Sequence, residues 1–114
     1  MSGEKFGAFV RRHREAKEIG LREMAKMIGV SPTYLSKVER DEFAAPAEDK
    51  VKAIAKVIGC DADDLLARAG RVATDISDII KRQPVELAAL LRTTKGLTAD
   101  DITRLARQAQ KAKD

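Results

Sequence analysis

Aromatic residues and cysteine are scarce in this 114-residue sequence. Trp is absent, Cys occurs once, and aromatic residues make up only 4 % of the chain. A single Cys excludes an internal disulfide and a cysteine-based zinc site, and the shortage of aromatics argues against a β-sandwich or barrel. No run approaches the ~20 apolar residues of a membrane span, and the first five residues lack the apolar core of a signal peptide. We therefore expect a cytoplasmic protein with no membrane partner and no bound metal.

Charged residues, in contrast, make up 35 % of the chain, and their signs are unevenly distributed. Residues 1–40 hold nine Lys and Arg against five Asp and Glu, residues 41–80 five against nine, and residues 81–114 eight against four. A basic beginning and a basic end suit an anionic partner, most simply nucleic acid. An excess this small is also common on an ordinary solvated surface, so charge alone does not decide between the two interpretations.

Apolar residues recur at helical spacing along the chain, which predicts an all-α protein. Within residues 4–70 we expect five short helices, because glycines end helices in this segment and Pro46 begins a new one. Residues 71–114 look like an addition to this unit: a short turn around 76–80, a helix after Pro84, and a last helix that Thr98 caps. The sequence therefore predicts a helical domain over 4–70 and a C-terminal helical extension over 71–114.

Residues 21–40 meet every requirement of a helix-turn-helix. Ala25 is small enough for two helices to cross closely, and Gly29, four positions later, tolerates the positive φ of a turn. Ser31 can cap the second helix, and Pro32 suits its first position. The apolar interior is supplied by Met24, Ile28, Val30, Leu35 and Val38.

With these residues the sequence resembles the lambda-repressor and Cro-like (XRE) helix-turn-helix family. The matching residues are Arg14-Glu15, Met24-Ala25, Ile28-Gly29-Val30-Ser31, Tyr34 to Arg40, Pro46, Ala55, Ile58-Gly59 and Leu65-Leu66. The resemblance covers residues 4–70 and implies a five-helix DNA-binding domain whose second and third helices are 21–28 and 31–40. It also implies a structural ion pair, buried or half-buried, between Arg14 and Glu39.

In this geometry the N-terminal half of the third helix enters the major groove of double-stranded DNA. Lys37 is the best candidate for a base contact, because a Lys can donate to guanine O6 and N7. The predicted base-reading residues are Pro32, Thr33, Ser36 and Lys37. Phosphate contacts, from backbone N–H groups at the start of the second helix and from side chains, are predicted for Leu21, Arg22, Ser31, Tyr34 and Arg40.

One position and one loop depart from the family pattern. Leu21 stands where the family usually has a side-chain amide, so its phosphate contact falls to backbone N–H groups or to Arg22. The loop over 41–45 is acidic and apolar where the family usually has a basic, glycine-containing loop. We expect Asp41 and Glu42 to repel phosphate, or the loop to contact a protein. His13 and Cys60 are expected to be packed side chains and not catalytic groups.

The extension indicates how the chain assembles. A lone helix of about fifteen residues is marginal in water, so 98–112 should pack on the preceding helix or on a second copy. The expected homodimer interface comprises Leu87, Leu90, Leu91, Ile102, Leu105 and Ala109.

Together these features predict a sequence-specific transcriptional regulator, most simply a repressor, that binds a palindromic operator as a homodimer. It is expected in the cytoplasm of a prokaryote, associated with the nucleoid. The alternative is an antitoxin or adaptor whose helical tail binds a partner protein. No phosphate-binding loop, nucleophile elbow or zinc-ligand spacing indicates an enzyme or a cofactor.

Overall fold

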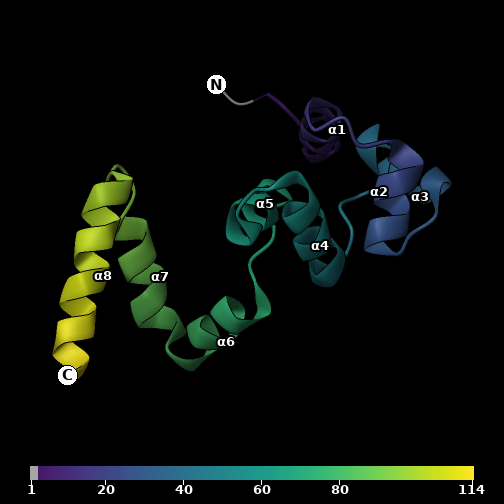
Figure 1. The fold of residues 1–114 in the computed structure, drawn as a ribbon. Coiled ribbons are helices and arrows are strands. Elements are labelled where there is room, and N and C mark those ends of the chain that lie inside the picture. The colour runs from purple at the N-terminus through teal and green to yellow at the C-terminus, as the bar shows by residue number, and fades with distance from the viewer. Residues whose placement is uncertain (1–2) are drawn as a thin grey trace. The chain divides into compact units, whose positions relative to one another are not determined.

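The computed structural model describes residues 3–114, which form eight helices and no strand (Figure 1). The helices are α1 (Phe6–Ala16), α2 (Leu21–Ile28), α3 (Pro32–Glu39), α4 (Glu48–Ile58), α5 (Ala62–Arg68), α6 (Thr74–Arg82), α7 (Pro84–Thr93) and α8 (Ala99–Lys113). The predicted all-α class is therefore confirmed. Within residues 3–114 no helix is long and apolar enough to span a membrane.

The chain divides into two units, the first ending at Thr74 and the second running from Asp75 to Asp114. In the first unit α1 and α2 both pack on α3 and on α4, and α5 packs on α4. An apolar core lies between these five helices. Its largest fully buried side chains are Met24, Leu35, Ile54, Leu65, Leu66, Val10, Val38 and Val51. Every helix from α1 to α5 contributes to this list, so their apolar stripes face one interior.

The corner between α2 and α3 is built from the residues that the helix-turn-helix pattern requires. Ala25 is fully buried, and its carbonyl accepts a hydrogen bond from Val30 N at 2.9 Å. Gly29 has φ +78°, a left-handed conformation that costs glycine little. Ser31 Oγ accepts the N–H of Tyr34 at 3.0 Å and so caps α3, whose first residue is Pro32.

The start of α1 lies directly against the end of α3. A Cβ atom on Gly7 would be 2.1 Å from the Val38 carbonyl oxygen, a distance that only a glycine allows. Asp41, in the loop after α3, accepts the backbone N–H of Gly7 at 2.7 Å and that of Ala8 at 3.2 Å. Lys5, at the N-cap position of α1, forms no side-chain cap, so Asp41 supplies that cap from 34 residues away.

The second unit has no buried core of its own. None of the residues in α6, α7 or α8 is buried. Of the predicted interface residues, Leu87 is half-buried, and the exposed ones are Leu90, Leu91, Ile102, Leu105 and Ala109.

The short turn predicted around 76–80 is wrong, because these residues belong to the nine-residue helix α6. Ile76, Ile79 and Ile80 have the i, i+3, i+4 spacing of a helical stripe. Asp75 in the first turn and the basic residues at 81–82 in the last turn match the helix dipole.

Candidate nucleic-acid interface

The two sides of α3 differ sharply in burial. Leu35, Val38 and Glu39 face inward and are buried. The predicted base-reading residues all keep part of their surface in solvent: Thr33 is exposed, and Pro32, Ser36 and Lys37 are half-buried. The helix therefore presents a polar outer side that a ligand can reach.

A hollow in the surface lies between the start of α2 and the outer side of α3. It is lined by Leu21, Arg22, Pro32, Thr33, Ser36 and Arg40. All six are residues for which the sequence predicts a DNA contact, three with bases and three with phosphate. The structure thus brings residues 21–22, at the start of α2, beside residues 32–40, although the two segments lie ten or more positions apart in the chain.

The start of α2 offers free hydrogen-bond donors at this hollow. The first intrahelical bond of α2 joins Met24 N to the Gly20 carbonyl at 3.0 Å, so the N–H groups of Leu21 and Arg22 precede the helical ladder. Gly20 has no side chain with which to cap them. Together with the positive end of the helix dipole and the Arg22 guanidinium, these donors favour an anion such as a phosphate.

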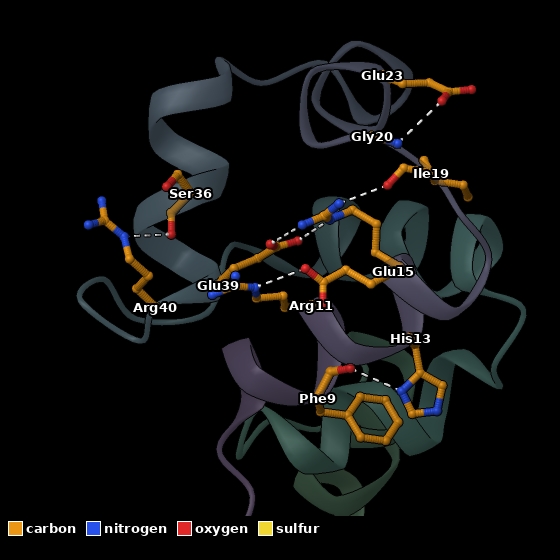
Figure 2. A network of polar contacts seen from close by, with 11 residues as sticks. Phe9, Arg11, His13, Glu15, Ile19, Gly20, Glu23, Ser36, Glu39 and Arg40 are labelled. Carbon is orange, nitrogen blue, oxygen red and sulfur yellow. Dashed lines mark hydrogen bonds and ion pairs between the residues drawn. The ribbon is translucent and has the colours of Figure 1, made fainter.

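A second hollow adjoins the first and shares Leu21, Ser36 and Arg40 with it; its other lining residues are Arg11, Arg14 and Glu39. Arg11 is not among the residues for which the sequence predicts a DNA contact. It lies on α1, where it pairs with Glu15 at 3.3 Å, and both side chains are more than half exposed (Figure 2). Arg11 precedes Arg14 by three positions and Glu15 by four, so these residues share one face of α1. This spacing is the feature of the sequence that could have indicated Arg11.

Arg14 and Glu39 form the ion pair that the family resemblance implies. The guanidinium donates from Nε and Nη2 to the two carboxylate oxygens, each at 2.8 Å, and from Nη1 to the Ile19 carbonyl at 2.7 Å (Figure 2). The hydrogen bond to Glu39 raises the pKa of Arg14. Both side chains are buried, so this pair links α3 to α1 within the interior of the first unit.

The Arg40 guanidinium is exposed but already has partners. Its Nη1 lies 3.2 Å from Glu42, and its Nε donates to the Ser36 carbonyl at 3.4 Å. A phosphate that binds Arg40 therefore competes with Glu42, whose side chain is about half exposed. Asp41 is placed differently, since its carboxylate is bonded to the start of α1.

Ser31, Tyr34 and Lys37 lie outside the two hollows. The Ser31 hydroxyl oxygen is occupied as the cap of α3. Tyr34 and Lys37 instead lie beside Phe43, a residue of the following loop for which the sequence predicts no contact with DNA. An apolar loop residue directly after an acidic pair carries no recognisable signal in the sequence, because its surroundings depend on how the loop turns back.

The two residues expected to be packed show ordinary environments. His13 Nδ1 lies 3.0 Å from the Phe9 carbonyl, and the two rings are 4.1 Å apart (Figure 2). Cys60 is partly buried against the core, and this burial raises the pKa of its thiol. Within residues 3–114, no three His, Cys, Asp or Glu side chains gather as they would around a metal ion.

The sequence and the fold both have relatives among known proteins. A family model described as "Helix-turn-helix" matches residues 10–65. The "Uncharacterized HTH-type transcriptional regulator Rv0474" of Mycobacterium tuberculosis is 41 % identical over 64 residues, which are 56 % of this chain and 45 % of that protein. The chain therefore spans less than half the length of that relative.

Two further relatives are more completely covered. The "ImmF control region 10 kDa protein" of Bacillus phage phi105 is 36 % identical over 61 residues, or 54 % of this chain and 67 % of that protein. The crystal structure of the P22 c2 repressor protein in complex with synthetic operator 9T matches with a TM-score of 0.51 and 30 % identity. That match covers 55 % of this chain and 94 % of the repressor chain.

Proposed function

The chain belongs to the lambda-repressor and Cro-like (XRE) helix-turn-helix family, and we propose that it is a transcriptional repressor that binds a palindromic DNA operator as a homodimer. The observation that carries this proposal is the hollow between α2 and α3. Six residues with predicted DNA contacts line it, and it lies beside free N–H donors at the start of a helix.

The proposed binding mode places the outer side of α3 in the major groove. Thr33, Ser36 and Lys37 then face base edges, with Pro32 giving an apolar contact. The start of α2, with Arg22, holds a phosphate on one side of the groove. Arg40 and Arg11 line the neighbouring hollow and are positioned for further phosphate contacts once their carboxylate partners are displaced.

The exposed apolar residues of the second unit support a homodimer. Leu90, Leu91, Ile102 and Leu105 each keep 41–53 % of their surface in solvent. Such a surface, with no buried residue beneath it, is stabilised when a partner covers it. A second copy of the chain also gives the two-fold symmetry with which helix-turn-helix proteins match palindromic sites.

Charge favours a second copy as the occupant of this surface. Each of the helices α6, α7 and α8, which form the tail, has acidic residues in its first turn and basic residues in its last turn. The acidic residues are Asp75 in α6, Glu86 in α7 and residues 100–101 in α8, and the basic residues are 81–82 in α6, Arg92 in α7, and Lys111 and Lys113 in α8. Two copies that lie antiparallel bring opposite charges together at both ends. A two-fold axis perpendicular to the helices produces that arrangement, because the acidic start of each helix then lies beside the basic end of the same helix in the other copy.

The same exposed surface also fits a second function. An antitoxin or adaptor uses an unburied helical tail to bind a different protein, and the tail then folds against that partner. Repression by occupancy needs only the DNA-binding unit and a second copy, so we place it first. In either case the proposed site of action is the cytoplasm of a prokaryote, on its nucleoid.

Selection of binding sites from random duplexes, followed by footprinting of the enriched site, tests this function. We expect a palindrome with half-sites about one helical turn, ~34 Å, apart. Lys37→Ala should lower the affinity for that site by about 1–3 kcal/mol and relax one base position. Arg22→Ala should weaken binding to selected and random duplexes alike. Enrichment of no sequence, or a footprint unchanged by Lys37→Ala, would contradict the proposal.

A further inference from the structure

The loop after α3 carries an aromatic side chain that the binding mode above does not use. The ring of Phe43 lies beside α3, with the Lys37 Nζ 5.3 Å from its centroid. The centroid of the Tyr34 ring is 5.9 Å from that of Phe43, and the two rings are inclined at 42°. Phe43 nevertheless remains 46 % exposed, so it is not a core residue. An ammonium and a second ring therefore share one exposed aromatic side chain at the edge of the proposed recognition helix.

The backbone of the loop fixes this arrangement. Asp41 has φ +59°, a left-handed conformation, and its carboxylate is held by the first N–H groups of α1. The N–H of Glu42 donates to the Lys37 carbonyl at 2.9 Å, and that of Phe43 to the same carbonyl at 3.4 Å. The chain thus turns back at Asp41, so that Phe43 lies beside Lys37 and its ring faces the Lys37 ammonium.

A lysine gains from such support more than other base-contacting residues do. Its ammonium is a point charge on a flexible four-carbon stem, without the fixed geometry of a guanidinium or an amide. It distinguishes guanine only when Nζ is held near O6 and N7. The face of an aromatic ring attracts the cation and restricts where the stem can place it.

We propose that Phe43 is a specificity-determining positioning residue, whose ring holds the Lys37 ammonium in place and so sharpens discrimination at the base pair that Lys37 contacts. This inference rests on the proposed function, in which α3 lies in the major groove. Phe43 acts through Lys37 and needs no contact of its own with a base.

The test uses the full chain and the operator enriched by selection. The base pair that Lys37 contacts is identified with Lys37→Met, which keeps the stem and removes the charge. It is the position of the operator at which this variant no longer discriminates between bases. Phe43→Leu keeps an apolar side chain and removes the ring. We expect it to reduce discrimination at that base pair by about two- to fivefold, as loss of an exposed cation–π contact does, and to leave discrimination at the other positions unchanged.

Two controls separate positioning from a purely structural role. Phe43→Tyr keeps the ring face and should keep the discrimination. In the Lys37→Met background, Phe43→Leu should have no further effect at that base pair. In the free protein, the ε-methylene protons of Lys37 should show an upfield ring-current shift that Phe43→Leu removes and Phe43→Tyr retains.

Several results would overturn the inference. One is that Phe43→Leu keeps full discrimination at that base pair. Another is that Phe43→Leu lowers the affinity for every sequence equally. A third is that Phe43→Leu causes the same loss of discrimination with and without the Lys37 charge. In these cases the wild type still binds its operator, so the proposed function survives. A wild-type chain that enriches no duplex would overturn the proposed function and this inference together.

Discussion

The guanidinium of Arg14 and the carboxylate of Glu39 meet in two parallel hydrogen bonds of 2.8 Å, with both residues less than one-tenth exposed. This pair joins the last turn of α1 to the last residue of α3, while a third bond from Arg14 fixes the Ile19 carbonyl before α2. The three helices around the candidate interface are thus connected through one guanidinium. The orientation of α3 depends on that connection.

Removal of one partner from this pair should be costly. Glu39→Ala leaves a buried guanidinium without its anion, and we expect a loss of about 3–5 kcal/mol in the free energy of unfolding. Replacing both residues, as in Arg14→Met with Glu39→Met, should cost less than the Glu39→Ala change, because no unpaired charge is buried. Urea denaturation at neutral pH measures both. Glu15→Ala, which breaks the exposed pair with Arg11, is the control and should change stability by about 1 kcal/mol or less.

A methyl group at position 7 should also destabilise the first unit. The Cβ of Gly7→Ala would meet three oxygens within 2.1–2.8 Å, two of them backbone carbonyls of α3 that cannot move independently. We expect a loss of about 1–3 kcal/mol in unfolding free energy, as in other overpacked sites. Gly3→Ala, which has open space around it, makes the matched control. Equal thermal midpoints for the two variants would contradict the close approach of α1 to α3.

Glu42 should weaken DNA binding through its contact with Arg40. Glu42→Gln removes a negative charge beside the proposed phosphate site and frees the Arg40 guanidinium from its 3.2 Å partner. We expect tighter binding to selected and random duplexes alike, with the slope of log K against log salt concentration steeper by about one phosphate contact. Fluorescence anisotropy across a salt series measures this slope.

Asp64→Asn provides the matched control for this charge change. It removes one carboxylate from another exposed pair, with Arg68 on α5, and changes the net charge equally. An affinity gain as large as that of Glu42→Gln would mean that total charge, and not the release of Arg40, controls binding.

Sequence alone predicted the parts of the first unit that depend on local pattern. The boundaries of α2 follow from Gly20 and Gly29, and the start of α3 from Ser31 and Pro32, because caps and breakers act within a few residues. The resemblance supplied the Arg14–Glu39 pair, which no local pattern shows.

Features that depend on distant contacts were not predictable in this way. Asp41 was expected to repel phosphate, yet its charge is used 34 residues away at the start of α1. Nothing in the local sequence marks Gly7 as important, because the close contact at this position comes from the carbonyls of α3. Phe43 likewise acquires a role only because the loop turns back beside Lys37. The base and phosphate contacts themselves stay predictions, since they require the DNA.

Acid should remove a contribution that Glu48 makes to the first unit. The pKa of Glu48 is lowered to about 2, first by the hydrogen bond from Lys52 and then by those from Thr74. The Thr74 hydroxyl and N–H lie 2.6 and 3.0 Å from the carboxylate. A lowered pKa means stability that is present above the unfolded value of 4.5 and is lost as the pH falls toward 2.

We therefore expect the difference in stability between wild type and Glu48→Gln to shrink steadily as the pH falls through this range. Thermal melts at successive pH values measure it. Thr74→Val removes one donor, so the acid-induced loss should begin at a higher pH than in wild type. A difference that stays constant from pH 5 to about 2 would show that the carboxylate charge adds no stability.

The exposed apolar side chains of the tail should control the oligomeric state. Leu105→Glu places a charge in the centre of the α8 stripe, and burying that charge in a dimer interface is unfavourable. Light scattering after size exclusion should show a wild-type dimer and a Leu105→Glu monomer at micromolar concentration, with the helix content nearly unchanged. Lys111→Gln, on the opposite side of α8, alters the net charge equally and should remain dimeric. A monomeric wild type, with and without DNA, would contradict the proposed homodimer and favour the tail as a site for a different protein.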